Sequence, residues 1–177
     1  MRVVLVNSSD TTGGAAVVTY RLMNALRAEG VDARMLVFCK NTRDDNVAQV
    51  PHAMSFLNEC AYVFYRNGFS RRNLFRLSAG RFGTSVARHP WIRKADVIAL
   101  NWVNQGLLSL DGIERLGRLG KPMVWTMHDM WPLTGACHHA YECTRYRDTC
   151  GSCPYIKGGA VKADMSRFRW IRKHNLY

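Results

Sequence analysis

The sequence has 177 residues, a net charge of +12 at neutral pH, and 47% hydrophobic against 21% charged residues. This length and composition exclude an intrinsically disordered chain and fit one domain with a core of its own. No stretch approaches the ~20 apolar residues of a membrane-spanning helix, and the first ten residues lack the pattern of a signal peptide, so we expect a cytoplasmic protein.

The first 39 residues predict a strand, a helix and a second strand. A short run of Val and Leu at residues 2–7 is typical of a buried strand, and a loop with two adjacent glycines follows it. Residues 15–29 predict a helix, and Gly30 stands where a helix C-cap would lie. The apolar residues at helical spacing are Val18, Leu22, Ala25 and Leu26. The apolar run at residues 33–39 completes a unit of the kind that builds parallel sheets.

Two further strands are predicted later in the chain, at residues 97–100 and 123–127. Between them, residues 109–119 predict a helix with Ser109 as its N-cap, and the run 120–122 ends it. This alternation of strands and helices indicates an α/β fold. We therefore expect a Rossmann-like parallel sheet with flanking helices.

A basic and aromatic segment separates the second and third predicted strands. No acidic residue occurs between Cys60 and Asp96. Because the charged residues of this interval are all basic, we expect it to attract anionic partners. Its basic residues are Arg66, Arg71, Arg72, Arg76, Arg81, Arg88, Arg93 and Lys94. Aromatic residues interleaved with arginines predict an amphipathic helix pair over residues 54–87, and residues 54–94 would then lie on the anionic inner membrane. The alternative is a helical flap that covers the sheet and turns its arginines to water.

The loop after the first predicted strand is the first candidate binding element. Gly13 and Gly14 stand just ahead of a predicted helix, where free backbone N–H groups and the helix dipole favour a diphosphate. The pair does not form the dinucleotide-binding fingerprint, and it could equally serve only the turn.

His128 and Asp129 form the second candidate site, directly after the predicted strand at residues 123–127. Ligands of open α/β sheets bind at the carboxyl ends of the strands. A neutral His128 could hydrogen-bond a sugar hydroxyl while Asp129 orients its ring. The alternative is a buried pair that only closes the strand end.

Four cysteines form the third candidate site, within a cysteine-rich loop insertion. Cys137, Cys143, Cys150 and Cys153 could converge on one tetrahedral zinc ion with a structural role, because the last two make a C-x-x-C half-site. The first pair is spaced more loosely, so free thiols, disulfides, or a redox or iron–sulfur role stay open. His138 or His139 could replace one thiol as a ligand.

Four segments carry a resemblance to a known family. They are residues 7–16 with Gly-Gly-Ala-Ala, residues 96–110 with Asn-Trp-Val-Asn, the run Gly-Lys-Pro-Met-Val-Trp-Thr-Met-His-Asp-Met-Trp-Pro-Leu-Thr-Gly at 120–135, and the cysteine-rich run to Pro154. The sequence resembles the amino-terminal domain of family-four retaining glycosyltransferases of bacterial polysaccharide synthesis, and is similar to the colanic acid enzymes.

The resemblance implies the amino-terminal half of a GT-B fold and a UDP- or GDP-sugar donor. It implies that Gly13 and Gly14 approach the donor diphosphate, that His128 contacts the transferred sugar, and that Asp129 lies beside it. A hexose would be transferred with retention to a glycan acceptor, commonly lipid-linked, in cell-surface polysaccharide synthesis. Family members carry a second, donor-binding domain, so we expect residues 1–177 to be a truncated acceptor-side domain with negligible activity alone.

Two functions from other classes compete with this interpretation. A zinc-stabilised, basic nucleic-acid-binding module would also combine arginines with four cysteines. However, the two groups fall in separate segments and show no recognition-helix pattern, so we expect no nucleic-acid partner. The other alternative is a non-catalytic protein that docks on a transferase.

Overall fold

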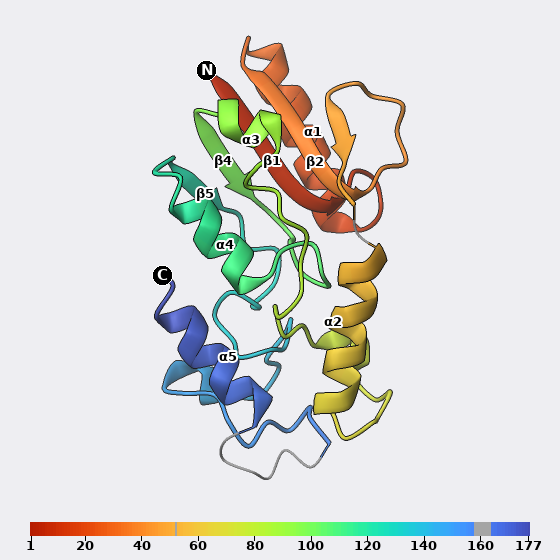
Figure 1. Cartoon of the computed structure of the whole chain (residues 1–177), viewed down its shortest axis with the longest axis vertical. Helices are drawn as coiled ribbons and strands as arrows, with labels where there is room; N and C mark the ends of the chain where they lie inside the picture. Colours follow the sequence, from red (N-terminus) through yellow and green to blue (C-terminus); the bar gives the residue numbers. More distant parts are fainter. Residues whose placement is uncertain (52, 158–163) are drawn as a thin grey trace.

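The computed structural model describes residues 1–51, 53–157 and 164–177, and its five strands form one parallel sheet (Figure 1). The strands are β1 (Arg2–Ser9), β2 (Asp32–Cys39), β3 (Val47–Gln49), β4 (Val97–Leu100) and β5 (Met123–Trp125), in the order β3-β2-β1-β4-β5. Every pairing in the sheet is parallel. The predicted Rossmann-like α/β fold is confirmed.

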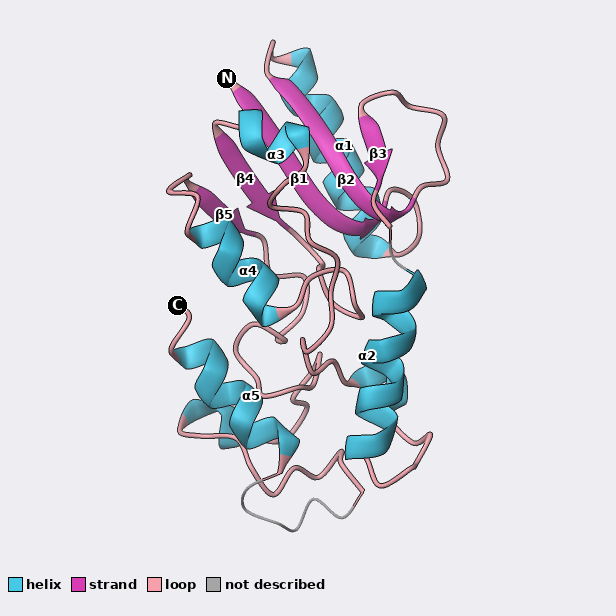
Figure 2. Cartoon of the chain, viewed as in Figure 1, coloured by secondary structure: helices cyan, strands magenta, loops and turns pink. Residues whose placement is uncertain are grey.

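Helices cover both faces of the sheet (Figure 2). On one face, Met23 of α1 (Gly14–Ala28) packs with the inward residues Val3 and Leu5 of β1. On the other face, α3 (Pro90–Lys94) and α4 (Leu110–Gly117) pack over Val4 and Val6. Alternate residues of β1 therefore serve two cores, as a strand buried on both faces must.

Helix α1 presents a different face to the sheet than its sequence predicts. Ala16, Thr19 and Met23 are buried, whereas Val18 is 52% exposed and Leu22 is 40% exposed. Small side chains let a helix lie close to the strands, and the Thr19 hydroxyl donates to the Ala15 carbonyl oxygen at 2.7 Å, which satisfies its polar group. Of the four apolar residues noted at helical spacing, Leu26 packs against this core, whereas Val18 and Leu22 face outward.

The segment after β3 contains one long helix, not a helix pair. Helix α2 (Ala53–Arg66) is followed by a single 3-10 turn, η1 (Leu74–Arg76), and then by extended chain. The buried carboxylate of Glu59 in α2 fixes this chain by accepting four backbone N–H groups at 2.6 to 3.0 Å. The donors are Ala79, Gly80, Arg81 and Phe82. The Glu59 carboxylate therefore holds the extended chain in place where a second helix was predicted.

A third core lies beside the carboxyl edge of the sheet. Val63 of α2 and Met165 of α5 (Met165–His174) pack with Leu77 and with residues of the cysteine-rich loop. That loop contains a 3-10 turn, η2 (Arg145–Arg147). Figures 1 and 2 show α2 and α5 on two sides of this region, below the sheet.

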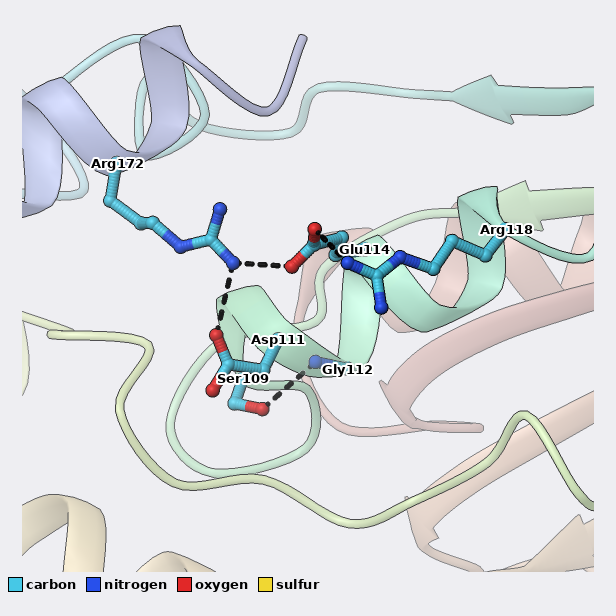
Figure 3. Close-up of polar contacts among 6 residues, drawn as sticks. All are labelled: Ser109, Asp111, Gly112, Glu114, Arg118 and Arg172. Carbon is cyan, nitrogen blue, oxygen red and sulfur yellow. Dashed lines mark hydrogen bonds and ion pairs between the residues drawn. The ribbon is translucent and has the colours of Figure 1, made fainter.

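Ion pairs join α5 to α4 (Figure 3). The Arg172 guanidinium pairs with Asp111 at 3.1 Å and with Glu114, which also pairs with Arg118 at 2.7 Å. The predicted N-cap of α4 is present, because the Ser109 hydroxyl oxygen accepts the Gly112 N–H at 3.0 Å. The ion pairs of Arg172 therefore connect α5 to α4, which itself packs on the sheet.

Candidate functional site

An open cavity of about 620 Å³ lies at the carboxyl edge of the sheet, and both predicted groups of ligand-binding residues line it. Gly13 and Gly14 line it from the β1–α1 loop, and His128 and Asp129 line it from the segment after β5. The carboxyl ends of parallel strands meet at one edge, which is where ligands of such sheets bind.

The glycine loop is held open toward the cavity. Gly13 has φ +90°, a conformation that other residues rarely adopt, and it precedes the first turn of α1. At both Gly13 and Gly14 an added Cβ would meet no atom within 4 Å. The first turn of α1 has no acidic residue, so the positive end of the helix dipole is not neutralised there.

A buried carboxylate positions the same loop. Asp10 accepts the backbone N–H of Asn41 at 2.9 Å and that of Thr42 at 2.8 Å, together with the Thr42 hydroxyl at 2.7 Å. Burial alone would raise the pKa of Asp10, but the hydrogen bonds from Thr42 and Asn41 outweigh it and hold the pKa below its usual value. The β1–α1 loop is therefore tied to the chain that follows β2.

His128 is oriented by an amide of the neighbouring strand end. Its Nε2 lies 3.2 Å from Asn101 Oδ1, while Asn101 Nδ2 donates to the Ala99 carbonyl oxygen. This arrangement fits a proton on Nε2 and leaves Nδ1 as an acceptor. Burial lowers the pKa of His128, and the nearby Asp129 only partly opposes this, so the ring is neutral at pH 7.

The hydrogen bonds of the Asp129 carboxylate go to residues other than the His128 ring that we expected it to orient. The carboxylate accepts Trp102 Nε1 at 2.6 Å, Asn104 Nδ2 at 2.9 Å and the Trp131 backbone N–H at 2.9 Å. Asp129 therefore ties the chain after β4 to the chain after β5 and fixes the floor of the cavity.

Sequence reasoning did not assign several of the lining residues to this cavity. Trp102 follows β4, so the same strand-end rule that singled out His128 would have found it. Arg76 and Tyr141 come from loops far from the sheet in sequence, where no local pattern marks them. His138 is buried against the Ser78 hydroxyl at 2.9 Å, and burial lowers its pKa to about 4.

The four cysteines of the predicted zinc site lie around one separate, small cavity. All four thiols are free, and burial raises the pKa of Cys137, of Cys150 to about 11 and of Cys153 to about 12. Across residues 1–51, 53–157 and 164–177, no three His, Cys, Asp or Glu side chains are placed to hold a metal ion. The structure therefore does not support the predicted zinc site.

The two histidines offered as substitute ligands are placed elsewhere. His138 contacts Ser78, and both His138 and His139 line the large cavity at the sheet edge. Neither of them lines the small cavity among the cysteines.

Helix α2 carries an exposed apolar stripe. Met54, Leu57 and Tyr65 are 69%, 58% and 59% exposed, and Phe69 just beyond the helix is 67% exposed. Arg71 and Arg72 follow in the next turn and are also exposed. No helix in the described part of the chain has the length and hydrophobicity to cross a bilayer. Contact of residues 54–94 with a membrane stays a prediction.

Residues 12–173 match the family model described as Glycosyltransferase Family 4. Searches of curated proteins and of solved structures found no significant match. The family match covers nearly the whole chain and includes both groups of predicted ligand-binding residues.

Proposed function

Because this chain belongs to glycosyltransferase family 4, we propose that its cavity is the place where a nucleotide sugar meets its glycan acceptor. Membership implies a sugar donor and a glycan acceptor in general terms, and the parallel sheet is that of the amino-terminal domain of a GT-B fold. The observation that carries the proposal is that Gly13, Gly14 and His128 line one cavity at the carboxyl edge of that sheet.

The donor diphosphate is the ligand that we assign to the glycine loop. Backbone N–H groups at the start of α1 and the helix dipole attract negative charge there. The absence of a Cβ at Gly13 and Gly14 lets phosphate oxygens approach the backbone closely. As the bond to the sugar breaks, charge develops on the departing diphosphate, and the same groups stabilise it.

His128 is the residue that we assign to the transferred sugar. Its neutral ring has Nε2 toward Asn101, so Nδ1 is the atom that can accept a hydroxyl proton in a hydrogen bond. We further propose a UDP- or GDP-activated hexose, retention at the anomeric carbon, and a second Rossmann-like domain that closes the cavity and selects the nucleotide. Transfer would serve cell-surface polysaccharide synthesis.

The substitution Gly14→Asp tests the donor site. A carboxylate at the start of α1 repels a diphosphate, while the open space around Gly14 spares the fold. We expect UDP or GDP to bind the wild-type chain, and the dissociation constant to rise at least about tenfold in the variant, as measured by isothermal titration calorimetry. Gly14→Ala, which adds bulk without charge, is the matched control and should weaken binding less than Gly14→Asp does. Absence of UDP and GDP binding, or equal binding by Gly14→Asp, would overturn the donor site.

We also propose that the stripe on α2 rests on the cytoplasmic face of an anionic membrane, which would bring a lipid-linked acceptor to the cavity. Exposed apolar side chains beside arginines are typical of helices that lie in the interface plane. Leu57→Glu should weaken binding to phosphatidylglycerol vesicles by about tenfold or more in a sedimentation assay, because it removes an apolar contact and adds repulsion.

The matched control for this membrane test is Leu22→Glu. Leu22 is likewise exposed and apolar, but it lies on α1, away from the arginines of the 54–94 segment. We expect this variant to bind the vesicles like the wild type. A similar loss for both variants, or equal binding to neutral phosphatidylcholine vesicles, would count against α2 as the contact.

A further inference from the structure

The cavity has a second set of lining residues, which comes from two loops that pair with each other. Leu77 forms an antiparallel bridge with Cys137, and the His138 N–H donates to the Arg76 carbonyl oxygen at 3.0 Å. This pairing places Arg76, at the end of η1, beside Tyr141 of the cysteine-rich loop. Two segments more than sixty residues apart therefore form one wall.

Arg76 has a positive charge with no carboxylate to balance it. Its guanidinium lies 5.6 Å from the centroid of the Tyr141 ring, and none of the described carboxylates forms an ion pair with it. Asp129, the carboxylate that lines the same cavity, accepts three donors from other residues.

Aromatic side chains surround this charge and face solvent. Phe75 is 67% exposed and Tyr141 is 64% exposed, although both line the cavity. Tyr141 also has φ +48°, a conformation that aromatic residues rarely adopt and that tends to persist where a ligand is bound. Flat apolar faces beside a guanidinium suit a ligand that combines a ring with an anionic group.

We propose that Arg76, flanked by Phe75 and Tyr141, binds the carboxylate or phosphate of an acidic glycan, so that the acceptor of this enzyme is anionic. The guanidinium forms paired hydrogen bonds to such a group, and the aromatic faces pack against the adjoining sugar ring. This inference rests on the proposed function, because it assigns the chemistry of the acceptor within the same cavity.

The test compares three sugar probes by isothermal titration calorimetry. They are a disaccharide ending in glucuronic acid, its neutral counterpart cellobiose, and glucose 1-phosphate. We expect at least one anionic probe to bind about tenfold or more tightly than cellobiose, and Arg76→Ala to remove that preference. The stronger of the two anionic probes identifies carboxylate or phosphate as the group bound.

Arg88→Ala is the matched control, because Arg88 is an exposed arginine of the same acid-free interval that does not line the cavity. It should keep the preference for the anionic probe. An equal loss for Arg88→Ala, or no preference in the wild type, overturns the inference. UDP and GDP binding separates the two claims: it should survive Arg76→Ala, and its absence from the wild type would refute the donor site instead.

Discussion

Replacement of Gly135 by Ala is expected to lower the free energy of unfolding by more than about 3 kcal/mol. Gly135 is buried in the cysteine-rich loop, and an added Cβ would lie 2.2 Å from the Ser166 carbonyl oxygen and 2.7 Å from its carbon. These are backbone atoms at the start of α5, so no side-chain rotation relieves the overlap. Either the loop or the helix has to move.

Urea denaturation followed by circular dichroism measures this effect, with Gly117→Ala as the control. Gly117 is exposed at the end of α4, and the nearest atom to its added Cβ is the Met123 methyl carbon at 4.0 Å. Alanine favours helix over glycine, so this variant should gain about 0.5 to 1 kcal/mol. If Gly135→Ala unfolds at the same urea concentration as the wild type, the packing of α5 described above is wrong.

Glu59→Gln is expected to cost about 3 kcal/mol of stability, although the two side chains have nearly the same shape. The carboxylate accepts Ala79 and Gly80 through one oxygen and Arg81 and Phe82 through the other. A glutamine turns one of these acceptors into an NH₂ donor, which faces two backbone N–H groups. Those buried donors then lose their partner.

Thermal unfolding measures the loss, and Glu142→Gln is the control. Glu142 is exposed in the cysteine-rich loop, so its substitution should stay within about 0.5 kcal/mol of the wild type. Equal melting temperatures for wild type and Glu59→Gln would mean that the backbone N–H groups find other acceptors, and that Glu59 does not hold the chain after η1.

The sheet could be predicted from the sequence because β1, β2 and β4 each consist of an apolar run bounded by polar residues. Residues 97–100 form β4 as predicted, and the starts of β1 and β2 differ by at most one residue from the prediction. Once the strands are parallel, the meeting of Gly13 and His128 at one edge follows from topology. The sequence alone therefore predicts the residues that follow the sheet strands and line the cavity.

The other features of the fold and of the cavity depend on tertiary contacts that no local sequence pattern indicates. Strand β3 has only three residues and is defined by its pairing with Met35, Leu36 and Val37. Glu59 resembles a solvated acid in the sequence, because its partners lie twenty or more residues further on. Arg76 meets Tyr141 only through the bridge between Leu77 and Cys137. Tertiary pairing of this kind is invisible to periodicity.

The inward-facing carboxylate of Glu59 also affects how fast ligands arrive. With that charge buried, every charged side chain between Cys60 and Asp96 is cationic, and one of them, Arg76, lines the cavity. Their field reaches about 8 Å at physiological ionic strength and farther in dilute buffer. Added salt should therefore slow the capture of an anionic ligand more than it shortens the lifetime of the complex.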